Sequence, residues 1–120
     1  MTIRVGIIGR NFVVDWMLVA MQQVPQLRPA AIYSRNEATG WEFAEKYGLT
    51  AVYTDLEAFA ASDSYDAAYI ASRNLCHFDQ AMCLLQSGKH VLLEKPGVLT
   101  ARQTQQLIDT ARAHHVVYLE

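Results

Sequence analysis

The start of this 120-residue chain constrains its fold more than any other stretch. An apolar run of strand length, Ile3–Ile8, ends at Gly9, and an amphipathic segment follows at once. Strand, tight glycine turn and helix are the layout of a dinucleotide-binding βαβ unit. The glycine allows the backbone to come close to a pyrophosphate, and the helix N-terminus offers free N–H groups and the positive end of its dipole.

The glycine fingerprint is incomplete. In G-x-G-x-x-G register, Gly9 takes the first position, Asn11 the second and Val14 the third. Asparagine is the next-best residue for a left-handed backbone, so we expect Asn11 to keep the turn. The turn would then place Gly9, Arg10, Asn11 and Phe12 against the cofactor. On these residues alone, an ordinary strand-to-helix turn explains the pattern equally well.

The rest of the chain continues the alternation. Strands are expected at 3–8, 30–34, 51–53, 66–72, 90–94 and 116–119, and helices at 12–24, 36–47, 54–61, 74–87 and from 100 onward. Asn36, Thr54, Asn74 and Thr100 are the expected N-caps. Short connections with this alternation predict one domain over 1–120: a Rossmann-like, doubly wound parallel sheet of three layers, with strand order 3-2-1-4-5-6.

Ligands of such sheets bind outside the carboxyl ends of the strands, which directs attention to the loops there. Ser34 and Arg35 follow the second strand, where an NAD site usually has an acidic residue, so this pair favours the 2′-phosphate of NADP over NAD. Arg35 can also stack on the adenine face, and Arg10 in the glycine turn can add to the same phosphate site. A solvated arginine in a turn is the alternative. Lys95 follows the fifth strand, where an ammonium can assist deprotonation of a substrate hydroxyl.

The loop after the fourth strand contains Ser72, Asn74 and His77. Asn74 is placed to cap the following helix whether or not a ligand binds. His77, taken by itself, is more simply a surface or half-buried histidine than a ligand-binding group.

Composition excludes several classes of protein. The formal net charge of −2 gives no sign of a nucleic-acid partner or an anionic membrane, and no apolar run is long enough to span a bilayer. Cys76 and Cys83 are too far apart on one predicted helix for a disulfide, so we expect buried free thiols and a cytoplasmic location. No second ligand cluster accompanies them, so no metal site is expected.

Taken together, the loops resemble the N-terminal half of the Gfo/Idh/MocA oxidoreductases, and the resemblance covers essentially the whole chain. The stretches that carry it are Gly6–Gly9, Ala31–Arg35, Tyr69–His77, Ala81–Leu85 and Gly88–Pro96. The last of these, Gly-Lys-His-Val-Leu-Leu-Glu-Lys-Pro, is the most characteristic. Three positions depart from the usual pattern: Asn11 and Val14 replace small residues, and Arg73 stands where a proline is usual. The arginine is expected either to make this loop less rigid or to contact a ligand directly.

This resemblance implies a function. Such proteins bind NAD or NADP on this domain and move a hydride between the nicotinamide and a hydroxyl-bearing carbon of a sugar, cyclitol or related polyol. By the resemblance, Glu94 and Lys95 border nicotinamide and substrate, Lys95 is the catalytic candidate, and Ser72, Asn74 and His77 line the cofactor. A homo-oligomer is compatible with it.

Members of this family run to well over 300 residues, and a second domain supplies most of their substrate pocket. We therefore expect this chain to be the cofactor-binding part of a longer protein, with the C-terminal substrate domain absent, which binds a dinucleotide without useful turnover. The alternative is a free-standing dinucleotide-sensing or interaction module that has lost the chemistry. A Rossmann-type methyltransferase is disfavoured, because Ser34 and Arg35 replace the acidic residue expected there.

Overall fold

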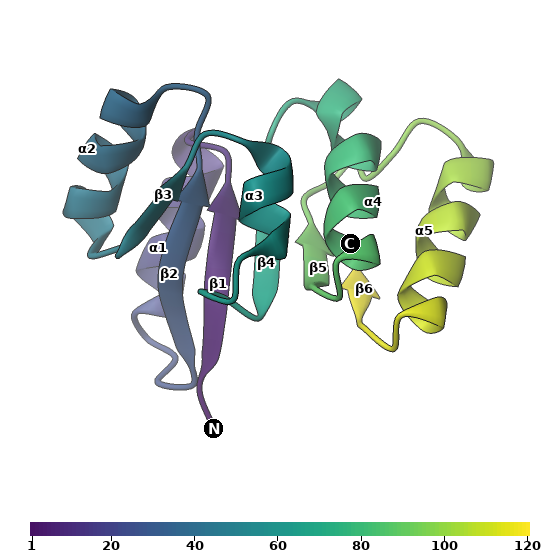
Figure 1. Cartoon of the computed structure of the whole chain (residues 1–120), viewed down its shortest axis with the longest axis horizontal. Coiled ribbons are helices and arrows are strands. Elements are labelled where there is room, and N and C mark those ends of the chain that lie inside the picture. Colours follow the sequence, from purple (N-terminus) through teal and green to yellow (C-terminus); the bar gives the residue numbers. More distant parts are fainter.

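A computed structural model describes all residues, 1–120, and contains a single six-stranded sheet with helices on both sides (Figure 1). The strands are β1 (Ile3–Ile8), β2 (Leu27–Tyr33), β3 (Ala51–Tyr53), β4 (Ala67–Ile70), β5 (His90–Leu93) and β6 (Tyr118–Leu119). The helices are α1 (Phe12–Met21), α2 (Glu37–Tyr47), α3 (Leu56–Ala61), the short 3₁₀ helix η1 (Asn74–Cys76), α4 (His77–Gln86) and α5 (Ala101–Ala113).

The sheet is parallel throughout, with the strand order β3-β2-β1-β4-β5-β6, which confirms the predicted Rossmann-like fold. Ile8, the last residue of β1, pairs with Tyr33 of β2 and Ile70 of β4. The carboxyl ends of these three strands are therefore level. The direction of the connections reverses between β1 and β4, so a crevice is expected at that edge.

The alternation of side chains along β1 divides the core into two layers. Val5 and Ile7 belong to the cluster beneath α1 and α2, whereas Ile8 belongs to the larger cluster on the opposite face, beneath α3, α4 and α5. Gly6 also faces this larger cluster, where an added Cβ would lie only 2.8 Å from the Phe59 ring. Both faces of the central strands are thus buried, as their unbroken apolar runs predict.

The α1 side of the sheet is covered only in part. Beside α1, over β4, β5 and β6, lies an open hollow of about 730 Å³ with a largely apolar lining that includes Met17, Tyr69 and Leu92. Leu92 and Leu119, at its edge, are 38% and 58% exposed. In Figure 1, α3, α4 and α5 lie in front of the sheet and α1 behind it.

Some expected element boundaries were wrong. Helix α1 ends at Met21 rather than at residue 24, and β2 runs over Leu27–Tyr33 rather than 30–34. The longer β2 contains Pro29, which cannot donate to a sheet ladder. However, β3 pairs only with the last three residues of β2, and the β1–β2 register shifts next to Pro29. The missing donor is therefore accommodated.

The N-caps were also predicted with mixed success. Asn36 and Thr100 accept hydrogen bonds from the Thr39 and Gln103 N–H groups, as expected. Helix α3, by contrast, is capped by Asp55, which accepts from Ala58 N–H, and not by Thr54. Asn74 caps no helix, because it begins η1, and neither η1 nor α4 has a side-chain cap.

Two further observations concern the expected function classes. Cys76 and Cys83 are free, but both are half-buried rather than buried. None of the helices has the length and apolar character needed to cross a membrane.

Candidate functional site

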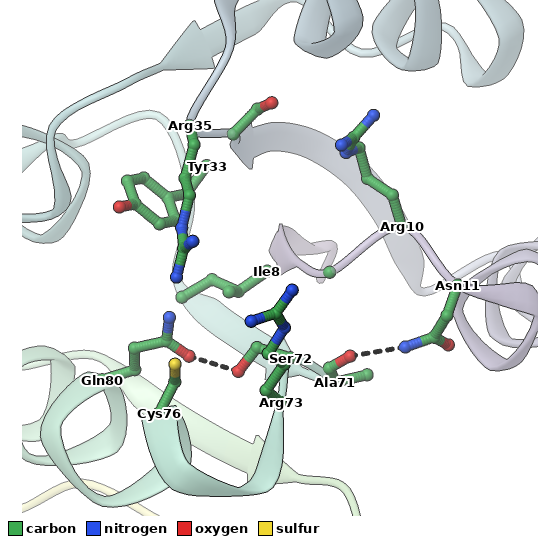
Figure 2. A pocket seen from close by; sticks show the side chains of 12 residues that line it. Ile8, Arg10, Asn11, Tyr33, Arg35, Ala71, Ser72, Arg73, Cys76 and Gln80 are labelled. Carbon is green, nitrogen blue, oxygen red and sulfur yellow. Dashed lines mark hydrogen bonds between the residues drawn. The ribbon is translucent and has the colours of Figure 1, made fainter.

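A groove of about 570 Å³ lies at the carboxyl ends of β1, β2 and β4, where the strand order reverses (Figure 2). Its walls come from the loops after these strands and from the start of α4. The lining residues are Ile8, Gly9, Arg10, Asn11, Tyr33, Ser34, Arg35, Ala71, Ser72, Arg73, Cys76 and Gln80. Of the predicted site residues, Gly9, Arg10, Asn11, Ser34, Arg35 and Ser72 are brought together here.

Gly9 brings the β1 turn into close contact with the β4 loop. Its φ is +117°, a conformation that side chains rarely adopt, and an added Cβ would lie 2.5 Å from the Ala71 carbonyl oxygen. The Ala71 N–H donates to the Ile8 carbonyl at 2.8 Å, which extends the β1–β4 ladder to the edge of the groove. The absence of a side chain at Gly9 therefore lets the β1 turn pack directly against the backbone of the β4 loop at the edge of the groove.

Asn11 does not have the left-handed backbone that we expected. Its φ of −82° and ψ of 177° are extended, and only Gly9 in this turn has a positive φ. The Asn11 Oδ1 accepts from the N–H groups of Val13 and Val14 at 3.0 and 3.3 Å, and its Nδ2 donates to the Ala71 carbonyl at 2.7 Å. Asn11 thus caps α1 and ties it to the β4 loop. It leaves the Phe12 N–H, at the first position of the helix, with no hydrogen bond inside the protein.

The groove is rich in positive charge. Arg10, Arg35 and Arg73 line it, each from a different loop, and none of them forms an ion pair. The chain's two ion pairs, Arg4–Asp66 and Lys46–Asp15, use other cations. Arginine side chains beside a helix N-terminus and a glycine turn suit a ligand that carries several phosphate charges.

Two serines shape the walls. Ser34 is 4% exposed, and its Oγ donates to the Asn36 carbonyl at 2.8 Å, which holds the turn after β2. Ser72 Oγ donates to the Gln80 Oε1, so α4 supports the loop after β4 (Figure 2). Both hydroxyl protons therefore have partners within the protein. These serines can hydrogen-bond to a ligand only by accepting at their hydroxyl oxygens.

Five residues predicted to contact the cofactor do not line the groove: Phe12, Asn74, His77, Glu94 and Lys95. Phe12 is 62% exposed and packs edge-on against Trp16, and Asn74 is exposed on η1. His77 is only 1% exposed, neither a surface nor a half-buried residue. Its Nε2 lies 3.0 Å from the Ser72 carbonyl oxygen, and its Nδ1 lies 2.9 Å from that of Gly97. The imidazole thus joins the loop after β4 to the loop after β5.

Glu94 and Lys95 lie in a separate, smaller hollow of about 230 Å³ that also includes Tyr69 and Met17. The Tyr69 hydroxyl donates to Glu94 Oε2 at 2.6 Å, and the Lys95 N–H donates to Glu94 Oε1 at 3.3 Å. Burial, together with the Glu94 carboxylate, raises the pKa of Tyr69, so this hydroxyl remains a donor. The Glu94 carboxylate is held at both oxygens, whereas the Lys95 side chain is exposed.

Several lining residues were missed by the sequence analysis. Tyr33 and Ile8 end their strands, and Cys76 and Gln80 reach the groove because η1 and α4 start beneath the β4 loop. Tyr33 and Ile8 could have been predicted from their positions at the ends of strands. Arg73 was expected either to make its loop less rigid or to contact a ligand directly, and the structure places it in the groove.

The fold and the groove define a class of protein. A doubly wound parallel sheet with a glycine turn after β1 and an arginine-lined groove at its switch point is a dinucleotide-binding Rossmann domain. The family model described as "Oxidoreductase family, NAD-binding Rossmann fold" matches residues 3–120. The chain belongs to this family, the Gfo/Idh/MocA oxidoreductases, and forms their NAD(P)-binding domain.

Curated relatives are similar over nearly the whole chain. Scyllo-inositol 2-dehydrogenase (NADP(+)) IolU of Bacillus subtilis is 40% identical over 98% of this chain and 36% of its own length. D-xylose 1-dehydrogenase (NADP(+)) 2 of Haloferax volcanii is 33% identical over 96% of this chain and 35% of its own length. The chain therefore spans about a third of the length of these relatives.

A solved structure shows the same arrangement with a bound dinucleotide. KijD10, a 3-ketoreductase from Actinomadura kijaniata in complex with TDP-benzene and NADP, superposes with a TM-score of 0.89 at 31% identity. The match covers 98% of this chain and 37% of that one. This chain is related to NAD(P)-dependent dehydrogenases acting on CH–OH groups and corresponds to their N-terminal domain.

Proposed function

We infer that this chain is the cofactor-binding part of an oxidoreductase that transfers a hydride between NADP and a hydroxyl-bearing carbon of a sugar, cyclitol or related polyol. The observation that carries the NADP preference is the groove itself. Arg35 follows β2 and lines the groove without an acidic partner, and no acidic residue is among the lining residues. A carboxylate there would bind ribose hydroxyls, whereas a guanidinium suits a 2′-phosphate.

The residues present fit a dinucleotide. Gly9 lines the groove without a side chain, and the backbone N–H of Phe12 has no internal partner at the N-terminus of α1. Gly9, Arg10 and Asn11 would hold the pyrophosphate, and Ser34 and Arg35 the adenosine end. Ser72 would contribute from the β4 loop. The side chains of Phe12, Asn74 and His77 do not line the groove, so Phe12 would contribute only its backbone N–H, and Asn74 and His77 would act indirectly.

The proposed chemistry centres on Lys95. The bound nicotinamide accepts or donates the hydride, and the protein must manage the proton of the substrate hydroxyl. Lys95 is exposed at the end of β5, beside a carboxylate that Tyr69 and the Lys95 N–H hold in place. Its amine can take the hydroxyl proton during oxidation and return it during reduction.

The substrate class comes from the relatives. Those named above act on inositol or xylose with NADP, but this chain matches only about a third of their length. A second domain would supply the remaining substrate contacts, so we expect this chain alone to bind the cofactor without useful turnover. A homo-oligomer of the longer protein and a cytoplasmic location complete the proposal, the latter supported by two free cysteines.

A non-catalytic dinucleotide-sensing module is the second candidate. The observation that favours it is Asn11, whose side chain occupies two N–H groups of the α1 N-terminus that a phosphate could otherwise use. The retained Glu94 and Lys95 favour the enzyme, because a sensor needs neither.

Calorimetric titration of this chain with NADPH and separately with NADH tests the proposal. We expect NADPH to bind more tightly, and Arg35→Asp to weaken it by about tenfold or more, since a hydrogen bond to a charged group contributes about 1.5–3 kcal/mol. Arg102→Asp, with the same charge change on α5, is the matched control and should bind as the parent chain does. Binding of neither dinucleotide would refute the proposal.

A further inference from the structure

The backbone conformation at Arg73 does not require an arginine. The role of its side chain can therefore be considered apart from the role of the loop. Its φ of −63° and ψ of 142° are those of polyproline, and its N–H donates no hydrogen bond within the protein. A proline would therefore fit this position without strain. Any role that is specific to arginine at this position therefore belongs to its guanidinium group.

The guanidinium of Arg73 lies in the groove opposite that of Arg35. Both residues line it, Arg35 from the loop after β2 and Arg73 from the loop after β4. Figure 2 shows both side chains pointing into the space over Ile8, while Arg10 extends away from it. The two guanidinium groups are therefore held in the groove by two separate loops.

Two cations held in one groove repel each other unless an anion lies between them. No carboxylate does so here: the groove has no acidic lining residue, and neither arginine forms an ion pair. A terminal phosphate monoester has about two negative charges and three acceptor oxygens, so it can bind two guanidinium groups at once. A pyrophosphate bridge has one charge on each phosphorus and suits the glycine turn instead.

We propose that Arg73 is a specificity-determining residue, which together with Arg35 clamps the 2′-phosphate of NADP from the β4 side of the groove. This inference rests on the proposed function, since it assigns one more contact to the same cofactor. It differs from stacking of Arg73 on the adenine ring, which would strengthen the binding of NAD and NADP equally.

The test is calorimetric titration of the 120-residue chain, its Arg73→Pro variant and its Arg73→Gln variant with NADPH and with NADH. Arg73→Pro keeps the backbone conformation, and Arg73→Gln keeps a polar side chain if the proline disturbs Ser72. Arg102→Gln is the control for a lost positive charge far from the groove. Circular dichroism spectra verify that each variant is folded.

We expect both Arg73 variants to bind NADPH at least about tenfold more weakly and NADH within about twofold of the parent chain. The same selectivity should appear with 2′,5′-ADP against 5′-AMP, and the NADPH advantage should shrink below about pH 6, where the monoester takes up a proton. Equal losses for both dinucleotides, or no loss in either variant, would overturn the inference and leave the proposed function standing. A parent chain that binds neither dinucleotide overturns both.

Discussion

The close approach of Gly9 to the β4 loop leads to a quantitative prediction for Gly9→Ala. The substitution adds a Cβ that would lie 2.5 Å from the Ala71 carbonyl oxygen, at a residue with φ of +117°. An L-residue in such a conformation costs about 1–3 kcal/mol, and inserting a methyl group into a packed site costs a further 1–3 kcal/mol or so. Because the neighbour is backbone rather than a flexible side chain, relief requires the β1–β4 edge to move.

The expected loss of stability is therefore about 2–6 kcal/mol. For a chain of 120 residues, the unfolding entropy is about 0.25 kcal/mol per degree, so Tm should fall by at least about 8 °C. Thermal unfolding followed by circular dichroism measures this change.

Gly48→Ala is the matched control, because Gly48 has φ of +73° but no atom within 4 Å of an added Cβ. It should pay only the conformational cost of about 1 kcal/mol, which is about 4 °C in Tm. If Gly9→Ala and Gly48→Ala lower Tm equally, the contact with Ala71 has no energetic effect, and the reasoning about this turn is refuted.

Two further predictions concern single side chains. Hydrogen bonds from Arg4 hold the pKa of Asp66 at about 2, below its ordinary 3.8, so its stabilising effect is full above about pH 4 and is lost as pH falls towards 2. Urea unfolding should show Asp66→Asn less stable than the parent chain at pH 6 and nearly equal to it at pH 2; a difference independent of pH would contradict this. Asn11→Ala should lower the free energy of unfolding by about 1–2 kcal/mol in a urea titration, because α1 loses its cap. An unchanged midpoint would show that water replaces the cap at no cost.

Most of the fold was predictable because its signals are local. Strands buried on both faces have unbroken apolar runs, such as the one from Ala67 to Ala71, and the helices between them end at glycines such as Gly48. The residues that cap the helices were harder to predict. Thr54 and Asp55 are adjacent and equally able to cap, and local sequence does not decide between them. Asn74 lost its expected role because it lies in the 3₁₀ helix η1, and α4 begins only at His77.

The candidate site was predictable only where strand order alone determines it. The topological rule correctly brought Gly9, Arg35 and Ser72 to one groove. It could not show that Glu94 and Lys95 lie in a separate hollow, because that depends on side-chain packing around Tyr69. Nor could it show that Arg73 points into the groove, since loop direction is set by tertiary contacts.

The buried imidazole of His77 has an energetic consequence for how the two hollows behave. One ring contacts the carbonyl oxygen of Ser72 at the groove and those of Pro96 and Gly97 just beyond Lys95. Neither loop can shift without moving the other or losing a contact. We therefore expect a ligand that orders the Lys95 hollow to tighten dinucleotide binding, and by thermodynamic linkage dinucleotide binding should tighten that ligand by the same factor.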